Sequence, residues 1–535
     1  MEPSVSSKSR MPRGIPYIIG NEAAERFSFY GMKTILIIFM TDHLLMSENK
    51  GTIWVHTFVM AAYFLPLVGG LISDIFWGKY KTIIRLSLFY CIGHAVLALW
   101  ESPQTLAIGL AFIALGAGGI KSCVSAHVGD QFNRTNSDLL ERVFGYFYIS
   151  INVGATISTL LTPWLMQAYG PSIAFGVPGV LMLVATFCFW LGRKKFIAIP
   201  PVGWKKFKEE VLTPHGIKII LKLCVVYLFV SIFWSLFDQT ASTWVLQAKR
   251  TLMDKTIDLG FMQFEVLPDQ VQSINPILIV TLAPIFSFII YPFVNRFFKL
   301  TYLRKISIGL FISVLSFVII SWVEGRMEQG ITMNVGWQLL AFFFITVAEV
   351  LVSITTLEFS YTQAPNAMKS LIMGLFWLTV TLGNFITTKV NEYILRDVQV
   401  EQVITGEKTF LSMATPDGIT EGLKLEVDKI EEVKLLRTTD GKTDTVAFSG
   451  TFVIGKVDEV ANTFELLDIN KNLVRTVDAS RVHVNQTVFV NRLKGSSYFN
   501  FFVYLMLVTA VLFVFVALWY KEERYIQEHP VKPGV

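Results

Sequence analysis

Long apolar stretches recur along most of the chain, and short polar segments separate them. A helix needs roughly 20 apolar residues to cross the hydrocarbon core of a bilayer. Six segments before residue 193 and six after residue 216 qualify. They lie near 14–46, 53–77, 82–100, 104–124, 142–168, 172–192, 217–247, 272–295, 303–323, 336–360, 368–395 and 498–520. The pattern predicts an all-α membrane protein with twelve transmembrane helices.

A polar insert interrupts this pattern between the last two spans. Between Arg396 and Ser497 there are 13 Lys+Arg and 16 Asp+Glu, which leaves 33 basic and 25 acidic residues for the rest of the chain. The insert carries short runs of strand-forming residues, separated by turn sequences such as Asp417-Gly418 and Asp440-Gly441. We expect strands at 398–403, 423–427, 446–454, 464–467 and 482–490. A small β-rich domain is therefore predicted, with His483 on its surface.

The basic linker 193–216 divides the predicted spans evenly. We expect an N-terminal six-helix bundle at 14–192 and a C-terminal bundle at 217–395 and 498–520, with the β-rich domain at 397–496. Two packed bundles with a central pathway are typical of transporters.

Lys and Arg are retained on the cytoplasmic side of membranes. The segment Arg193–Lys218 alone holds seven of them. Both termini are therefore predicted to be cytoplasmic, and the insert to face outward. We expect no cleavable signal peptide, because the basic N-terminus is not followed by a short apolar core and a cleavage site.

The remaining composition excludes several classes of protein. Only 16% of residues are charged, and the mean hydropathy is +0.52. The net charge is only +5, and no block of basic residues in the sequence suggests binding to nucleic acid. The cysteines lie in or beside apolar segments, so no disulfide framework is expected: Cys91, Cys123, Cys188 and Cys224. No metal-ligand spacing, nucleophile elbow or phosphate loop is present, so we expect no enzyme, metal or cofactor.

An ionisable side chain inside a membrane span needs a partner or a function. The first span holds Glu22, Glu25, Arg26 and Lys33, and helical geometry places them within one broad face. Two acids and two bases can neutralise one another in a structural ion-pair knot. Alternatively, they can carry protons.

Further polar residues lie within the other spans. His56 and Tyr63 share one face of the second span, where an imidazole can carry a proton or sit buried and neutral. Lys121 follows the small residues 116–119, which permit close helix approach. Its amine can receive a substrate carboxylate or pair permanently with an acid.

Three pairs of residues complete the candidates. Tyr148 and Asn152 lie four apart, as do Trp234 and Asp238, so each pair shares a helix face. Glu349 and Glu358 are nine apart in the tenth span and point to opposite sides, so only one of them is expected to line a cavity. The three pairs lie in the fifth, seventh and tenth spans.

Several of these residues lie in ordered motifs. Glu22-Ala23-Ala24-Glu25-Arg26-Phe27 with Tyr30-Gly31 resembles the first-helix signature of the proton-dependent oligopeptide transporters, a family of the major facilitator superfamily. Other segments resemble that family in the same order: Gly118-Gly119-Ile120-Lys121 with Gly129-Asp130-Gln131-Phe132, Phe147-Tyr148-Ile149-Ser150-Ile151-Asn152-Val153-Gly154, Phe237-Asp238-Gln239, and Leu357-Glu358-Phe359-Ser360-Tyr361. The resemblance covers both predicted bundles and implies the major facilitator fold.

The resemblance also implies roles for individual residues. Lys121, with Lys33, would bind the peptide carboxylate, while Glu358, Asn152 and Asn275 would hold the peptide amino group. Tyr30, Tyr63, Tyr148 and Trp234 would shape side-chain pockets. Proton coupling would fall to Glu22, Glu25, Arg26, His56 and Asp238.

Four features depart from the family. Lys33 replaces the usual Arg, so a point charge stands where a planar fork could grip a carboxylate. Val55 stands where animal relatives often have Tyr. The linker 193–216 is too short for the two extra helices of many bacterial members. The insert also lies between spans eleven and twelve, whereas animal relatives carry theirs between nine and ten.

The predicted function is a proton-coupled symporter that imports di- and tripeptides by alternating access. The alternatives are a transporter of another small anion or metabolite, such as nitrate, and a non-transporting membrane receptor. We expect a multi-pass cell-membrane protein in the lipid bilayer, with a bacterial inner membrane favoured. Because nothing in 397–496 suggests chemistry, we expect its replacement by a short linker to leave uptake within a few-fold.

Overall fold

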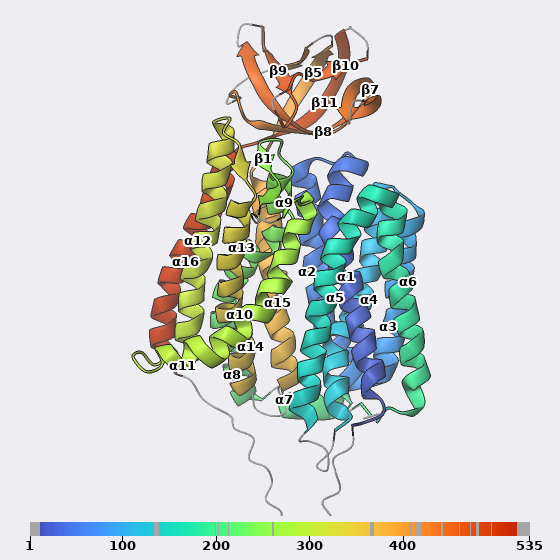
Figure 1. Ribbon diagram of the computed structural model, residues 1–535, viewed down its shortest axis with the longest axis vertical. Helices are drawn as coiled ribbons and strands as arrows, with labels where there is room; N and C mark the ends of the chain where they lie inside the picture. Colours follow the sequence, from blue (N-terminus) through green and yellow to red (C-terminus); the bar gives the residue numbers. More distant parts are fainter. Residues whose placement is uncertain are drawn as a thin grey trace, which may run out of the picture.

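The computed structural model describes residues 11–521, except 133–138, 198–199, 202, 212, 259, 261, 364–368, 406–407, 414–418, 440–441, 459–460, 471, 478–480 and 494. Long helices run side by side along the vertical axis in Figure 1, and a small β domain covers one end of them. The loop containing Asp440-Gly441 and the Asp417-Gly418 turn lie outside the described residues.

The first six long helices coincide with the first six predicted spans. Ser47 and Ser102 cap α2 and α4 with their hydroxyls, and Pro171 begins α6 where a missing N–H is tolerated. The elements are α1 (Ile15–Ile38) with the π-turn η1 (Phe39–His43), α2 (Glu48–Ile72) with η2 (Ser73–Trp77), α3 (Lys79–Leu99), α4 (Pro103–Asp130), α5 (Leu140–Tyr169) and α6 (Pro171–Leu191).

The short helix α7 (Trp204–Val211) follows in the linker, and the later predicted spans coincide with helices or consecutive helical segments. These are α8 (Pro214–Phe237), η5 (Asp238–Ala241) and α9 (Thr243–Ala248); η6 (Pro268–Ser273), α10 (Ile274–Ile285), η7 (Phe286–Ile290) and α11 (Tyr291–Val294); α12 (Tyr302–Glu328); α13 (Gly336–Glu349), η8 (Val350–Ile354) and α14 (Thr355–Thr362); α15 (Lys369–Tyr393); and α16 (Gly495–Trp519).

Within the described residues, 11 helical segments are long and apolar enough to cross a membrane. The first helix, α1, is not among them, although it has 24 residues. Its four ionisable side chains reduce its hydropathy, and they are the residues that the sequence singled out. A membrane protein with many helical spans is therefore confirmed, while the count of twelve stays a prediction.

The linker 193–216 divides the helices into two groups by their order in the chain. In the N-terminal helix group (α1–α6), α3 packs on α4, α1 on α5, and α2 on α4. In the C-terminal helix group (α8–α16), α12 packs on α16 and α13, and α15 packs on α8. The groups meet mainly where α2 lies along α15.

Small residues on α4 allow its close packing, as the sequence predicted. A Cβ on Gly118 would come within 2.8 Å of Leu65 in α2, and one on Gly119 within 2.3 Å of Leu86 in α3. Any larger side chain would push these helices apart. The glycines therefore bring Lys121, one turn further along α4, close to α1 and α2.

The insert folds as a closed antiparallel sheet. Its strand order is β10-β7-β11-β5-β6-β9-β8, and β7 also pairs with β8. Buried Val398 and Val400 alternate with exposed neighbours, and a register shift before Gln402 lets Val403 also face the core. The strands are β5 (Leu395–Ile404), β6 (Thr409–Met413), β7 (Lys424–Thr439), β8 (Lys442–Asp458), β9 (Thr463–Leu467), β10 (Arg475–Thr476) and β11 (Arg481–Asn491). His483 is exposed, as predicted.

Two short two-stranded sheets lie elsewhere: β1 (Met253–Asp254) with β4 (Met333–Asn334), and β2 (Thr256–Asp258) with β3 (Gln263–Glu265). The β domain itself is attached through both ends to the C-terminal helix group. The first strand of the domain, β5, follows α15, and its last strand, β11, precedes α16. The two connections lie together, because the Arg492 N–H donates to the Ile394 carbonyl over 2.8 Å. The domain is thus tied to that group by its own chain.

Candidate functional site

The acids of α1 share a single guanidinium. Arg26 Nε lies 2.7 Å from Glu22 Oε1 and 3.1 Å from Glu25 Oε2. Both carboxylates are buried, at 2% and 0% exposure. Among the described residues, Glu22 Oε2 and both oxygens of Glu25 accept no hydrogen bond, so the contact of Arg26 with Glu25 is an ion pair only. Arg26 can therefore stay paired with one acid while the other carries a proton.

Lys121 offers a buried cation beside this group. Its Nζ has no hydrogen-bond partner among the described residues. It lies 3.3 Å from the centroid of the Phe29 ring and 4.1 Å from that of Tyr63. Aromatic faces attract a cation without neutralising it. The amine is thus held in place with its charge available to an anion.

The second lysine, Lys33, is already paired. Its Nζ donates to Asp238 Oδ1 over 2.8 Å, and Asn384 Nδ2 donates to Asp238 Oδ2 over 2.7 Å. These contacts join α1 to η5 and α15. In this conformation Lys33 neutralises Asp238, an acid of the other helix group. Its charge is therefore not free to help Lys121 bind a carboxylate.

His56 extends the same network. Its Nδ1 lies 2.6 Å from Asn384 Oδ1, and its Nε2 lies 3.0 Å from the hydroxyl of Ser242. Because the Asn384 nitrogen donates to Asp238, its oxygen faces His56, and Nδ1 must be the donor. Nε2 then accepts from Ser242 in the neutral ring or donates to it in the charged ring. The ring is therefore connected to both helix groups in either state.

Asn275 lies beside Glu349 and not beside Glu358. Asn275 Nδ2 donates to Glu349 Oε2 over 2.8 Å and to Thr346 Oγ1 over 3.0 Å. Glu358 is exposed and accepts from the Tyr302 hydroxyl over 2.9 Å. Nine residues separate the two acids, about 13 Å along a helix. In this conformation Asn275 therefore lies with Glu349, and the assignment of the peptide amino group to Glu358 stays a prediction.

Several of the aromatic residues expected to shape side-chain pockets pack against other rings. Tyr63 packs against Trp377 with ring centroids 5.5 Å apart, and Phe29 packs edge-on against Tyr30 at 5.7 Å. Trp234 is buried, and its Nε1–H has no acceptor among the described residues. Asn152 is also buried. Tyr148 lies in α5, and its side chain falls outside the described residues.

Polar contacts between the helix groups gather in the half of the molecule that carries the β domain. Besides the Lys33 and His56 network, Asn49 Nδ2 donates to the Asn391 carbonyl over 2.9 Å. Lys249 pairs with Asp42, and Arg250 Nη2 lies 3.1 Å from Glu48 Oε2. These contacts hold the two groups together at that end.

Sequence reasoning missed several of these residues. Asn384 is an amide within an apolar span, a signal that could have been followed. Glu48 and Arg250 lie at span ends, where charges are common and carry no signal. Nothing in the part of the chain that the structure describes groups three or more metal-ligating side chains.

The helices long enough to span a membrane and their buried charges define a multi-pass membrane protein, and comparison with known proteins gives its family. The POT family model matches residues 80–211 and 204–405, and the chain belongs to that family.

Curated relatives include Peptide transporter family 1 of Drosophila melanogaster, 36% identical over 60% of this chain and 48% of its own length. Solute carrier family 15 member 2 of Homo sapiens is 36% identical over 60% of this chain and 50% of its length. The chain thus spans about half the length of these relatives.

Solved structures extend the similarity over more of the chain. An auto-inhibited POT family peptide transporter has a TM-score of 0.66 and 33% identity, covering 72% of this chain and 89% of that one. The POT family transporter PepTSo has a TM-score of 0.66 and 37% identity, covering 72% and 90%.

Proposed function

We propose that this chain is a proton-coupled symporter that imports di- and tripeptides by alternating access. The observation that carries the proposal is the buried Lys121 amine, which has no hydrogen-bond partner among the described residues. It lies over Phe29 of α1, the helix that also carries the two carboxylates that share Arg26. One site can thus bind an anion while the neighbouring acids exchange a proton. The peptide transporters among its relatives support the same substrate class.

In this proposal, Lys121 binds the peptide carboxylate, and Lys33 joins it when the Asp238 pair opens. Glu349, assisted by Asn275, takes the role that the sequence assigned to Glu358 and receives the amino group. A zwitterionic peptide can then bridge the two helix groups, which favours closure around it. The side-chain pockets remain assigned to Tyr30, Tyr63, Tyr148 and Trp234, and Asn152 keeps its assigned role of holding the peptide amino group.

Proton transfer would begin at Glu22 and Glu25, with Arg26 moving its pairing between them. His56 and Asp238 lie in the network that joins the two helix groups, so a proton there would weaken the pairing of Asp238 with Lys33. Binding energy and proton transfer would thus act on the same contacts that must break for opening.

The membrane arrangement is part of the proposal. We infer twelve spans in two six-helix bundles of the major facilitator type, both termini in the cytoplasm and the β domain outside, with a bacterial inner membrane favoured. The concentration of Lys and Arg in Arg193–Lys218 supports this orientation.

The direct test is labelled dipeptide uptake into proteoliposomes, with and without an inward-acid pH gradient. We expect accumulation only with the gradient, and its loss in Lys121→Ala. Nitrate or another small anion offered instead should not accumulate. The pairing of Asn275 with Glu349 favours a substrate with an amino group over a simple anion. Gradient-driven uptake of nitrate without peptide uptake, or no uptake of any solute, would overturn the proposal.

A further inference from the structure

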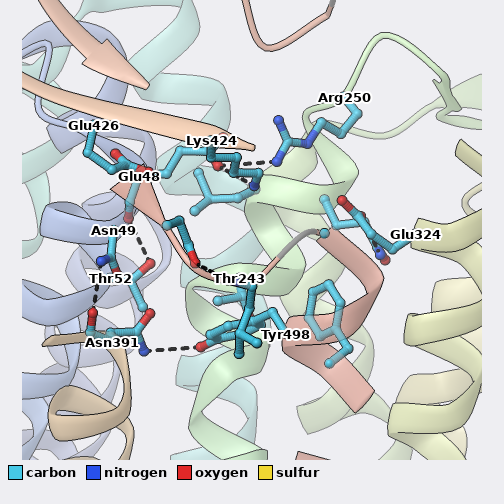
Figure 2. Close-up of a pocket in the computed structure, with 16 residues that line it drawn as sticks. Glu48, Asn49, Thr52, Thr243, Arg250, Glu324, Asn391, Lys424, Glu426 and Tyr498 are labelled. Atoms are coloured by element: carbon cyan, nitrogen blue, oxygen red, sulfur yellow. Dashed lines mark hydrogen bonds and ion pairs between the residues drawn. The ribbon is translucent and has the colours of Figure 1, made fainter. Parts of the chain in front are cut away.

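A polar cavity of about 60 Å³ lies where the β domain meets both helix groups. Figure 2 shows its lining residues coming from three parts of the chain. Glu48 and Asn49 belong to α2, Arg250 follows α9, and Lys424 and Glu426 belong to β7. The three parts therefore meet at one place.

Glu48 is the shared acceptor at this junction. Its Oε2 lies 3.1 Å from Arg250 Nη2 and 3.1 Å from Lys424 Nζ (Figure 2). The three side chains are 12–20% exposed, so solvent screens them less than an ion pair on the open surface. One oxygen thus joins the N-terminal helix group to the C-terminal group and to the β domain.

The β domain also contacts the backbone at the start of α2. The first N–H groups of a helix have no partner inside it. The Glu48 N–H donates to the Thr451 hydroxyl over 2.6 Å, and that hydroxyl donates to Glu426 Oε2 over 2.8 Å. Thr451 therefore supplies an acceptor that α2 lacks, in addition to the Ser47 cap on Lys50.

These contacts cross the boundary that alternating access must open. The β domain is tied to the C-terminal helix group through α15 and α16, whereas Glu48 belongs to the N-terminal group. Next to Glu48, a cavity of about 980 Å³ separates much of the domain from Leu45 and Met46. The attachment across the boundary thus depends on few contacts, as a reversible closure requires.

We propose that Lys424 and Thr451 of the β domain are gate residues that hold the two helix groups closed at its end of the molecule. Opening at that end separates Glu48 from both of them and from Arg250. The proposal rests on transport by alternating access, and it gives the insert a positioning role in that cycle.

The test measures opening directly and needs no substrate. Spin labels at exposed Gln104 and Gln329 report the distance between the outer ends of α4 and α12 by pulsed electron spin resonance, after the four native cysteines are replaced by alanine. In Lys424→Ala and Thr451→Val, we expect the ratio of long to short distances to rise about fivefold, as expected for loss of one partly buried polar contact. Lys424→Arg should retain the short distance.

Lys408→Ala is the matched control, because Lys408 pairs with Glu465 over 2.8 Å and both residues belong to the β domain. It should leave the distances unchanged. Equal distributions in Lys424→Ala, Thr451→Val and Lys408→Ala would overturn the gate role, even if peptide uptake is established. A shift in the first two variants would support it, even if the substrate proves not to be a peptide.

Discussion

Asn275 and Glu349 form a hydrogen bond of 2.8 Å that joins α10 to the end of α13. The π-turn η8 follows Glu349 directly, and Glu358 lies beyond it in α14. A π-turn adds a residue to the helical turn and shifts the face of everything after it. The acid beside Asn275 is the earlier of the two. Simple helical spacing places the two acids on opposite sides but does not say which of them faces Asn275.

Glu349→Ala should weaken peptides with a free amino group far more than N-acetylated peptides. Loss of a charge-assisted contact to an amine corresponds to roughly a 10- to 100-fold rise in the half-saturating concentration. Competition of unlabelled free and acetylated peptides against labelled dipeptide uptake measures this difference.

Glu358→Ala is the natural comparison, since that acid accepts from Tyr302 at an exposed position. It should affect free and acetylated peptides equally. A selective loss of free-amine peptides in Glu358→Ala, with none in Glu349→Ala, would restore the assignment made from the sequence.

The sequence predicted the helical segments and the β-rich insert, because hydropathy and strand periodicity are local properties. It also pointed to Lys121 and the α1 acids, since a charge in an apolar span is visible without a structure. It could not show that Asn275 lies beside Glu349 and not beside Glu358, because the π-turn between the two acids has no clear sequence signal. Nor could it pair Glu48 with Lys424, which are 376 residues apart. Both residues lie in polar stretches of the sequence, where a charged residue is common and gives no signal.

Lys121→Ala should affect the carboxylate end of the peptide, whereas Glu349→Ala should affect its amino end. The Lys121 amine lies over Phe29 and Tyr63 with no hydrogen-bond partner among the described residues, so removing it breaks no ion pair there. We expect peptides with free carboxylates to lose roughly 10- to 100-fold in affinity and C-terminally amidated peptides to lose little. Equal losses for both would indicate a structural role for the amine.

Glu22→Gln and Glu25→Gln should separate coupling from binding. Neither amide can exchange a proton, so accumulation driven by a pH gradient should vanish. Counterflow needs only substrate exchange and should survive in at least one variant. Uptake and counterflow measured in the same proteoliposomes test this. If both variants still concentrate peptide against its gradient, protons enter by another route.

External pH should act on the gate through Glu426. Burial and, after it, the neighbouring charge of Glu48 raise the pKa of this carboxyl to about 7, although Lys424 and the hydroxyls of Thr451 and Ser47 lower it. Arg250 adds a positive charge nearby. If opening returns Glu426 to water and an ordinary pKa near 4.5, the closed state binds the extra proton.

Closure is then favoured by acid. The equilibrium constant for closure is highest below pH 4.5. It falls by at most about tenfold per pH unit as the pH rises to 7, and it stays constant above pH 7. Distances between the Gln104 and Gln329 labels, measured from pH 5 to 8, should lengthen up to pH 7 and then level off. Glu426→Gln should remove this part of the dependence. Identical pH profiles with and without Glu426 would contradict the mechanism.

Replacing residues 397–496 with a flexible linker of about ten residues tests the insert as a whole. The Ile394 carbonyl and the Arg492 N–H are hydrogen-bonded over 2.8 Å, so such a linker, which reaches about 15–20 Å, reconnects the helices without strain. Because the substrate and proton residues lie outside the insert, we expect dipeptide uptake to remain within a few-fold.

The gate should respond nonetheless. Without Lys424 and Thr451, Glu48 keeps only Arg250, so the Gln104–Gln329 distance should lengthen at least as much as in Lys424→Ala. Adding Lys424→Ala to a chain that already carries Thr451→Val should approach the same limit, since both contacts end on Glu48. A linker variant that is folded and transports peptide, yet keeps the short distance of the intact chain, would show that Arg250 alone holds the closed state and that the β domain only rests upon it.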